Sequence, residues 1–387
     1  MPGIYAWGSG SSGQLGTRDD LDYAEPVKVD FEAAFVGITT GGGHSAGWTT
    51  SGELFTWGDA SRDRLGRATS SSPSLVAKPV LGLPPIDLAC CGWWHTVAIS
   101  QAQDSTDTSS SRPTQVYVWG HGHASKEALP LVAGDAQGTR STCAKVLVTS
   151  FPSSICVTSL SCGWKHSLIA TQDGRVFAWG KGRHGELAMG PTATEAMVPT
   201  RIESLAPQTI HRVFCGWQHS VFLTALGDVW TSGSNKHGQL GVPQVAHAFV
   251  PQRVQVLNTT DEAMVDVSVG WHHAVCLGRS GAVYGWGKGD LGQLGFGSFE
   301  SKSTPQPLPV FAHPPATVCQ VACGSEHTLF VMADGQVYSC GWGEHGNLGH
   351  GNIDNVATPT KIAFFQSRGV HVDRCIAGGA VSIALTH

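Results

Sequence analysis

Residues 163–180 read GWKHSLIATQDGRVFAWG and contain the pattern that decides the fold. Two short runs rich in β-forming residues, 167–170 and 175–179, flank the pair Asp173-Gly174. An Asp-Gly pair between such runs is a strong signal for a tight turn between antiparallel strands. Residues 163–180 are therefore predicted to form a loop followed by a β-hairpin.

The same pattern recurs along the whole chain. Each copy begins Gly-x-x-His-[Ser/Thr/Ala], continues with alternating apolar residues and a glycine turn, and in most copies ends on Trp-Gly. Six copies keep the histidine: His44, His95, His166, His219, His273 and His327. These histidines are 51, 71, 53, 54 and 54 residues apart, and a further step of 54 reaches Val381, in a seventh copy without histidine. A fixed period of this length indicates a repeat architecture.

A second phrase follows the end of each copy, as in Gly238-Gln-Leu-Gly241 and Gly292-Gln-Leu-Gly295. A loop and a strand marked by proline come next, for example at Pro251. Each repeat then holds about four short strands and no long amphipathic helix, which is the composition of a β-propeller blade.

The two ends of the chain are complementary halves of one repeat. Residues 4–8 read as the last strand of a hairpin, and residues 376–385 as the first half of one. Pairing them completes a ring of seven and hides the sheet edges. We therefore expect an all-β fold, a seven-bladed β-propeller whose last blade is closed by strands from both termini. It is expected as one domain over residues 1–387, with repeat boundaries near 8, 58, 120, 180, 233, 287 and 341.

Charge and composition narrow the classes of partner. The chain has 24 Lys and Arg against 29 Asp and Glu, a net charge of −5, and no basic run. Nucleic acid is not expected as a partner, because phosphate binding needs clustered basic residues. Membrane insertion is not expected either, since no stretch approaches the ~18 apolar residues of a span.

The start of the chain and the cysteines bear on the compartment. Residues 1–8 lack the features of a signal peptide. We therefore expect a monomeric cytoplasmic protein, with the nucleus as an alternative location. The eleven cysteines are expected as reduced thiols, because equivalent positions of successive repeats should lie too far apart for disulfides or shared metal ligation.

No catalytic motif is found. The sequence has no nucleophile elbow, HExxH or Walker loop. A Gly-x-Gly-x-x-Gly pattern occurs at 8–13, 180–185, 287–292 and 341–346, but in blade turns rather than between a strand and a helix. We expect no covalent chemistry, no cofactor and no metal. The six repeat histidines are predicted to be structural, each ring bonding loop backbone that would otherwise lack a partner.

The residues between Gly and His are the most informative for function. A propeller gathers these loops on one face around its central channel. The first position is Trp in four repeats (Trp93, Trp164, Trp217 and Trp271), and the second position varies (Trp94, Lys165, Gln218 and His272). The tryptophans either pack between blades as apolar wedges or form an aromatic contact ring for a partner.

The repeat pattern resembles the regulator of chromosome condensation repeat family over the whole chain. Within the family, residues 234–240, 323–327 and 342–345 are most similar to a branch of secretion-regulating guanine nucleotide exchange factors. The resemblance implies a small GTPase as partner, an exocyst subunit as a further partner, and exchange through differential binding. In the family, these loops face the GTPase, and the pair His272-His273 matches a His-His pair found there. The partner contacts implied are Trp94, Trp164, Lys165, Trp217, Gln218, Trp271, His272 and Glu326.

Two alternatives stay open. One is a scaffold of the same fold without exchange activity. The other is a UV-B sensor, because a light-sensing branch of the family stacks tryptophans from Gly-Trp-Arg-His-Thr loops and joins its dimer through the arginines. Here Lys165, Gln218 and His272 stand in place of those arginines. Residues 101–115 form a polar insertion, expected at a hairpin tip, with no assigned role.

Overall fold

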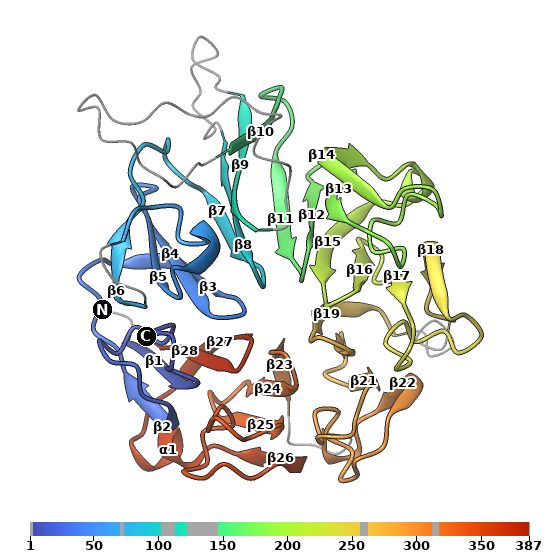
Figure 1. The fold of residues 1–387 in the computed structure, drawn as a ribbon. Coiled ribbons are helices and arrows are strands. Elements are labelled where there is room, and N and C mark those ends of the chain that lie inside the picture. The colour runs from blue at the N-terminus through green and yellow to red at the C-terminus, as the bar shows by residue number, and fades with distance from the viewer. Residues whose placement is uncertain are drawn as a thin grey trace.

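The computed structural model describes residues 3–69, 73–101, 113–121, 146–255, 262–311 and 317–386. Within these ranges, seven four-stranded antiparallel sheets stand around a central axis, as Figure 1 shows. This confirms the predicted all-β, seven-bladed propeller. We number the sheets as blades: blade 1 holds β3–β6, blade 2 β7–β10, blade 3 β11–β14, blade 4 β15–β18, blade 5 β19–β22, blade 6 β23–β26, and blade 7 β27, β28, β1 and β2.

Each blade runs from an inner strand at the axis to an outer strand at the rim. The inner strands are β3 (Phe35–Thr40), β7 (Leu88–Cys91), β11 (Val157–Cys162), β15 (Ile210–Cys215), β19 (Met264–Val269), β23 (Val318–Cys323) and β27 (Val372–Gly378). The second strands are β4 (His44–Thr49), β8 (His95–Ser100), β12 (His166–Thr171), β16 (His219–Thr224), β20 (His273–Gly278), β24 (His327–Met332) and β28 (Val381–Thr386).

The outer half of each blade follows in the same order. The third strands are β5 (Leu54–Gly58), β9 (Thr114–Gly120), β13 (Val176–Lys181), β17 (Val229–Ser234), β21 (Val283–Gly287), β25 (Val337–Gly341) and β1 (Gly3–Gly8). The outer strands are β6 (Ser74–Pro79), β10 (Val146–Phe151), β14 (Glu195–Arg201), β18 (His247–Arg253), β22 (Lys302–Pro307), β26 (Val356–Lys361) and β2 (Tyr23–Lys28). The third strands end at or next to the repeat boundaries expected from the sequence.

Blade 7 is built from both ends of the chain. Strand β1 pairs antiparallel with β28 in continuous register from Gly3 opposite Thr386 to Gly8 opposite Val381. Strand β28 in turn pairs with the inner strand β27, and the N- and C-terminal ends lie together in Figure 1. The predicted closure of the ring by the two termini is therefore confirmed.

The hairpin over residues 163–180 has the predicted turn. Strands β12 and β13 pair from His166 opposite Gly180 to Ala170 opposite Val176. Gly174 has φ +80°, and a Cβ there would lie 2.9 Å from the Cα of Thr209. Only glycine combines this left-handed conformation with such a close approach, so the Asp-Gly signal has both a conformational and a packing cause.

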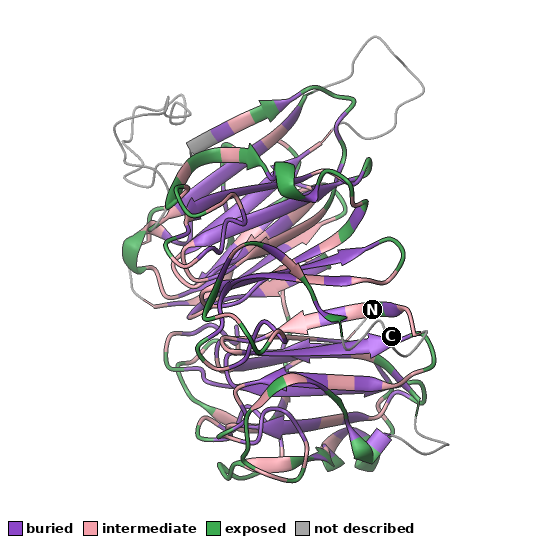
Figure 2. Ribbon diagram, turned by 90° about the vertical axis from the view of Figure 1, so that its right-hand side faces the viewer, coloured by how far each residue is buried: buried purple, intermediate pink, exposed green. Residues whose placement is uncertain are grey.

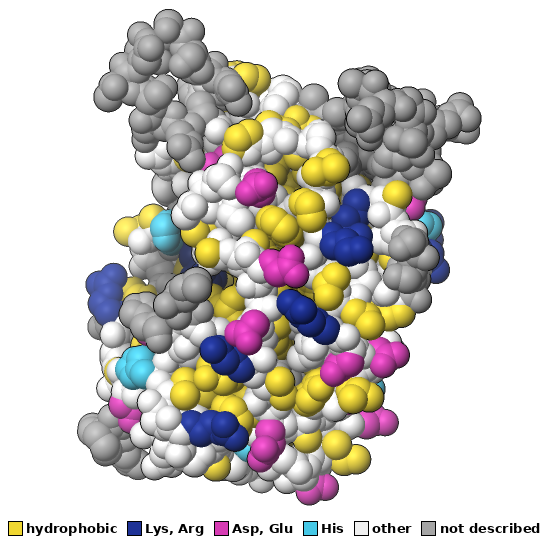
Figure 3. All heavy atoms as spheres, turned by 90° about the vertical axis from the view of Figure 1, so that its left-hand side faces the viewer, with side chains coloured by type: hydrophobic (Ala, Val, Ile, Leu, Met, Phe, Trp, Pro, Cys, Tyr) yellow, Lys and Arg dark blue, Asp and Glu magenta, His cyan; other side chains and the backbone are white. Residues whose placement is uncertain are grey.

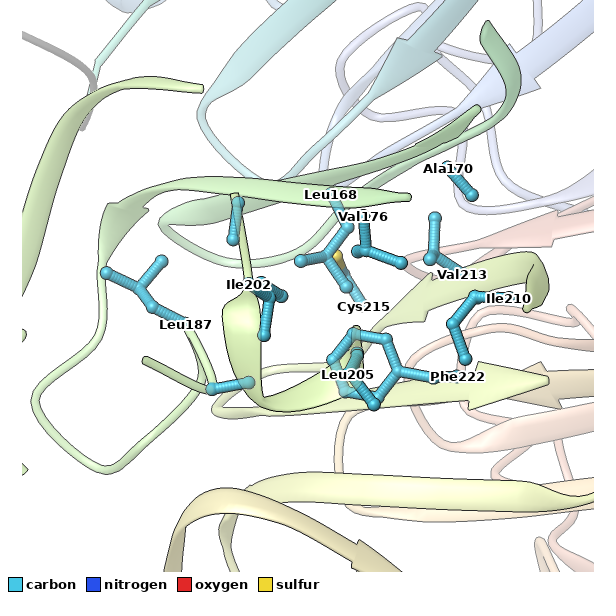
Figure 4. Close-up of a cluster of buried hydrophobic side chains, with 12 residues drawn as sticks. Leu168, Ala170, Val176, Leu187, Ile202, Leu205, Ile210, Val213, Cys215 and Phe222 are labelled. Atoms are coloured by element: carbon cyan, nitrogen blue, oxygen red, sulfur yellow. The ribbon is translucent and has the colours of Figure 1, made fainter. Parts of the chain in front are cut away.

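The hydrophobic core lies between neighbouring sheets. Between blades 3 and 4, Leu168 and Val176 of one sheet pack with Val213 and Phe222 of the next, as Figure 4 shows. Second strands such as β24 are buried at every residue because both of their faces are covered by other sheets. Outer strands and turns are more exposed, as the side view in Figure 2 shows. Burial between blades is the main apolar contribution to stability, at about 25 cal/mol per Å² of apolar surface.

Helical segments are short and lie in the connections. In the described part of the chain they are α1 (Ala363–Ser367) and the 3₁₀ turns η1 (Ser61–Asp63), η2 (Glu203–Leu205) and η4 (Pro309–Phe311). Among the described residues, no helix has the length and apolarity needed to cross a bilayer. Most of the insertion over residues 101–115 lies outside the described residues. On the side of the ring seen in Figure 3, the described basic and acidic side chains are interspersed and do not gather into one basic patch.

Candidate partner-binding face

The loops between inner and second strands carry the Gly-x-x-His phrases on one face of the ring. A Cβ on Gly216 would lie 2.1 Å from Cε1 of His219, and the same clash occurs between Gly270 and His273. The imidazole therefore occupies the space left by the missing side chain of the glycine. This packing explains why Gly and His recur three residues apart.

Five repeat histidines bond the next blade. In each, Nε2 lies 2.8–3.0 Å from the hydroxyl of the residue that follows the histidine position of the next blade. The pairs are His44–Thr96, His95–Ser167, His166–Ser220, His273–Thr328 and His327–Ser382. We call this contact the interblade latch. The sequence predicted that each ring bonds loop backbone. In the structure the ring instead bonds a side-chain hydroxyl of the next blade, because that hydroxyl lies within hydrogen-bond distance of Nε2.

The hydroxyl that bonds the histidine also donates a hydrogen bond to a backbone carbonyl of the blade from which the histidine comes. Thr96 donates to the carbonyl oxygen of Arg64 at 2.8 Å, and Trp119 Nε1 donates to the same oxygen at 2.9 Å. Because the single hydroxyl proton is used there, Nε2 of His44 must donate to Thr96, which assigns the Nε2–H tautomer. Ser220, Thr328 and Ser382 donate to carbonyls in the same way.

Two junctions depart from this arrangement. His219 of blade 4 faces blade 5, where Ala274 stands at the hydroxyl position, and neither ring nitrogen of His219 has a hydrogen-bond partner among the described residues. Between blades 7 and 1, Val381 replaces the histidine, and Ser45 still donates to the carbonyl of Gln14 at 2.8 Å. The latch is therefore present at five of the seven junctions that the described residues form.

Burial keeps the histidines neutral. Desolvation lowers the pKa of His44 and His327 to about 3 and the pKa of His166 and His273 to about 4. The pKa of His219 is lowered well below 6.5, first by burial and then by neighbouring histidines. A neutral ring is the form that the Nε2–H tautomer of the latch requires.

The first-position tryptophans of blades 2 to 5 form one aromatic cluster. The rings of Trp164 and Trp217 are stacked, with centroids 4.6 Å apart and planes 10° apart. Trp271 lies 4.5 Å from Trp217 and 4.8 Å from Trp93 between ring centroids. All four side chains are half-buried. The four rings contact one another across the channel mouth and keep part of their surface exposed. This geometry is that of an aromatic contact ring rather than of wedges buried between blades.

Two cations lie over tryptophan rings on this face, one over the Trp cluster and one over the neighbouring Trp94. Lys165 Nζ lies 3.9 Å from the ring centroid of Trp164, and the guanidinium of Arg62 lies 4.6 Å from the ring of Trp94. Lys165 and Gln218 line a groove of about 290 Å³ between blades 3 and 4, together with Lys181 and Arg183. An ammonium or guanidinium over an aromatic face is attracted by the ring quadrupole. The groove therefore combines aromatic surface with positive charge.

Glu326 is placed behind this face rather than on it. Its carboxylate accepts hydrogen bonds from Gln293 Nε2 at 2.6 Å and Lys288 Nζ at 3.0 Å, and lies 3.7 Å from Nδ1 of His272. Burial opposes ionisation, but the neighbouring His272, His273 and Lys288 lower the pKa of Glu326 to about 2. A buried carboxylate held this way fixes Lys288 and His272, so any contribution of Glu326 to a partner contact would pass through these two residues.

The structure brings most of the sequence-predicted contacts together. Lys165, Gln218 and His272 are half-buried and stand beside the Trp cluster, whereas Trp94 touches it only through Trp93, 6.0 Å away between ring centroids. Trp93 itself was missing from the predicted contacts, although its place after Gly92 is the place of Trp164 after Gly163. Lys288 and Arg62 were also missed, because they lie in the loops after the third strands. Among the described residues, no group of three or more His, Cys, Asp or Glu is placed to hold a metal ion.

The family model described as the RCC1-like domain matches residues 3–384. The chain belongs to the RCC1-like domain family. Among its relatives, the secretion-regulating guanine nucleotide exchange factor of Mus musculus is 31% identical over 386 residues, covering 93% of this chain and 78% of that protein. The ultraviolet-B receptor UVR8 of Arabidopsis thaliana is 30% identical over 353 residues, covering 90% of this chain and 74% of the receptor. The family assignment confirms the resemblance inferred from the repeats.

Solved structures agree with this RCC1-like fold. Yeast RCC1 (Prp20), in its complex with Kap60, aligns with a TM-score of 0.79 and 21% identity over 100% of this chain and 88% of that chain. Human WBSCR16 aligns with a TM-score of 0.81 and 17% identity over 100% of this chain and 99% of that chain. At these identities the likeness establishes the fold alone.

Proposed function

We propose that this RCC1-like propeller binds a small GTPase through the face that carries the Trp cluster and accelerates release of its guanine nucleotide. The observation that carries the proposal is the Trp cluster itself, with Lys165, Gln218 and His272 beside it. Half-buried tryptophans rimmed by polar and charged side chains are typical of the centre of a protein interface. The kinship with guanine nucleotide exchange factors supports the choice of partner.

Exchange of this kind needs no covalent step. The propeller would bind the nucleotide-free GTPase more tightly than the nucleotide-loaded form, and that difference loosens the nucleotide by linkage. Each tenfold difference in affinity corresponds to about 1.4 kcal/mol. The residues required are therefore recognition residues, which agrees with the lack of a catalytic motif in the sequence.

Secretion and a cytoplasmic location are part of the proposal. Two mammalian relatives are named secretion-regulating exchange factors. An exocyst subunit as a second partner remains a prediction from the family resemblance, and the monomeric state remains a prediction as well.

The test measures release of a fluorescent GDP analogue from a panel of purified small GTPases. We expect acceleration for at least one GTPase. Lys165→Glu should reduce that acceleration by about tenfold or more, because it places a negative charge over Trp164. Arg279→Glu is the matched control: it makes the same charge change in the exposed β20–β21 turn, which lies on the opposite face. Equal loss in both variants would contradict the assignment of the face.

A scaffold is distinguished in the same experiment. If no GTPase responds while a binding partner is still recovered on the purified chain, and Lys165→Glu abolishes that binding, the face is retained and the exchange activity is rejected.

The contacts within the Trp cluster favour one further candidate, a UV-B sensor. Ring centroids 4.5–4.8 Å apart allow neighbouring indoles to share excitation. A sensor also needs a light-sensitive assembly, and Lys165, Gln218 and His272 stand where the light-sensing branch has its dimer arginines. Gel filtration before and after near-UV illumination tests this: a change in elution volume would favour the sensor, and an unchanged volume would reject it.

A further inference from the structure

Two cysteines of neighbouring blades meet in the central channel. Cys90 is on β7 of blade 2 and Cys162 is on β11 of blade 3, and the Sγ of Cys162 lies 3.6 Å from the carbonyl oxygen of Cys90. From the sequence, cysteines at equivalent positions of successive repeats were expected to lie too far apart for a disulfide; Cys90 stands one residue before Cys91, which is the position equivalent to Cys162. Cys90 and Cys162 meet because the inner strands converge on the axis, where Trp93 N donates to Gly163 O at 3.1 Å.

At the position of the inner strand equivalent to Cys90, three other blades have a residue with a hydroxyl group. Thr39, Ser161 and Ser268 each use Oγ to accept the backbone N–H of a cysteine on the next inner strand, at 3.3, 2.9 and 2.8 Å. Cys90 has the same place on β7, so its sulfur faces the backbone N–H of Cys162. The chain thus replaces an oxygen by a sulfur at one of these sites.

The surroundings make the two thiols unequal. Hydrogen bonds from the Cys162 thiol and from the Cys162 backbone N–H stabilise the thiolate and lower the pKa of Cys90. Burial raises the pKa of Cys162 and of the adjacent Cys91. The thiolate is the reactive form of cysteine, so a stabilised thiolate beside a protonated thiol matches an attacking and a resolving pair.

Both cysteines of this pair border open space in the central channel. Cys90 and Cys162 are only partly buried, whereas Cys91 and Cys215 are buried. Both line a cavity of about 210 Å³ in the channel, together with Trp93 and Trp164; Cys91 and Cys215 also line this cavity but are more buried. Peroxide is a molecule of suitable size for such an opening.

We propose that Cys90 and Cys162 form a peroxide-reactive dithiol that closes to a disulfide between blades 2 and 3. The Cys90 thiolate attacks one oxygen of hydrogen peroxide, the O–O bond breaks, and hydroxide leaves and takes up a proton to become water. The sulfenic acid formed on Cys90 is then attacked by Cys162 sulfur, a second water leaves, and the S–S bond forms. Two thiols and one peroxide give one disulfide and two waters, so the peroxide accepts both electrons.

The test treats the full chain with limiting hydrogen peroxide, alkylates the remaining thiols and maps the peptides by mass spectrometry. We expect a cross-linked Cys90–Cys162 peptide pair before modification of the exposed Cys319, with a rate at least about tenfold higher. Cys319 is a suitable reference because more of its residue surface is exposed, although burial of its sulfur raises its pKa and so lowers its thiolate fraction. Oxidation of Cys319 first, with Cys90 and Cys162 still reduced, would overturn the proposal.

Three variants assign the roles. Cys162→Ser should stop the cross-link and leave a sulfenic acid on Cys90 that dimedone traps. Cys90→Ser should abolish the rapid oxidation and still fold, because serine occupies the equivalent place at Ser161 and Ser268. Cys91→Ala is the matched control for the neighbouring thiol and should keep the cross-link. Unchanged oxidation kinetics in Cys90→Ser, or loss of the cross-link in Cys91→Ala, would contradict the assignment.

Discussion

The junction between blades 3 and 4 differs from the junction between blades 4 and 5 by one hydroxyl group. At the first, Nε2 of His166 lies 3.0 Å from Oγ of Ser220, and that hydroxyl donates to the carbonyl of Glu186 at 2.7 Å. At the second, Ala274 provides no hydroxyl, and His219 keeps a buried ring without a bonded nitrogen among the described residues. Both junctions are formed by equivalent strands of neighbouring blades and have equivalent Gly-x-x-His packing. The latch therefore adds to a ring that apolar packing already closes.

The largest effect is expected from truncating a histidine of the latch. His166→Ala should destabilise the protein by about 3–5 kcal/mol, because it leaves a cavity and removes the bond to Ser220. His219→Ala leaves a similar cavity but removes no bond, and should cost roughly 1–2 kcal/mol less. The test is urea unfolding at pH 7.5. Equal losses would mean that the latch contributes nothing.

The second effect is a pH dependence of stability. The pKa of His166 is about 4 in the folded chain and near 6.5 when unfolded. Because the folded-state value is lower, stability is fully present above pH 6.5 and is lost as the pH falls toward 4. At pH 5 this histidine alone should cost about 2 kcal/mol relative to pH 7.5.

His166→Val isolates that contribution, since valine is the residue the chain itself uses at position 381. The difference in unfolding free energy between pH 7.5 and pH 5 should be about 2 kcal/mol smaller in the variant than in the unaltered chain. An identical pH dependence in both proteins would mean that His166 is not protonated more readily on unfolding.

The third effect comes from the hydroxyl. Ser220→Ala gives the blade 3–4 junction the same residues at the latch as the blade 4–5 junction. It removes the hydrogen bond between Ser220 and His166 Nε2 and the hydrogen bond from Ser220 to the carbonyl of Glu186. We expect a loss of about 1–3 kcal/mol, measured by thermal and urea unfolding. Ser204→Ala removes the hydroxyl of an exposed serine that bonds the carbonyl of Ala188, and this control for serine removal should cost less. A loss in Ser220→Ala no greater than in this control would speak against the latch.

The smallest effect is the reverse change. Ala274→Ser places a hydroxyl opposite His219 and within reach of the carbonyl of Gln239, which already accepts Trp286 Nε1 at 2.9 Å. A completed latch should stabilise the protein by about 0.5–1.5 kcal/mol. The double variant with His219→Ala should lose this gain, since the added serine then lacks its partner. A gain that persists in the double variant would point to a cause other than the latch.

The fold was predictable from the sequence because every repeat carries the same local signals for its strands and turns. The Asp173-Gly174 turn, the spacing of the histidines and the two half-repeats at the termini each determine one feature of the ring. Contacts between repeats were harder to predict. The hydroxyl that accepts the hydrogen bond of the latch belongs to the residue after the next repeat histidine. The Ser, Thr or Ala at that position of the motif was therefore a signal in the sequence. The histidine and this hydroxyl lie 52–72 residues apart in sequence, so the motif alone did not show that they pair.

Side-chain placement at the site was predictable only in part. Position in the loop identified Lys165, Gln218 and His272 as neighbours of the Trp cluster, because equivalent loops meet on one face. It did not predict that Glu326 is buried, since that depends on Lys288 and Gln293 from the β21–β22 loop of blade 5. The meeting of Cys90 and Cys162 depends on how closely the inner strands approach the axis, which repeat spacing alone does not reveal.

The measurement that tests the proposed binding face most directly is hydrogen–deuterium exchange of the chain alone and with a nucleotide-free GTPase from the panel. We expect slower exchange in the loops around residues 92–94, 163–165, 216–218 and 270–272, with no change in the opposite turns at 225–228 and 279–282. Protection confined to those opposite turns or to the outer strands, or no protection with any GTPase, would contradict the assignment of this face.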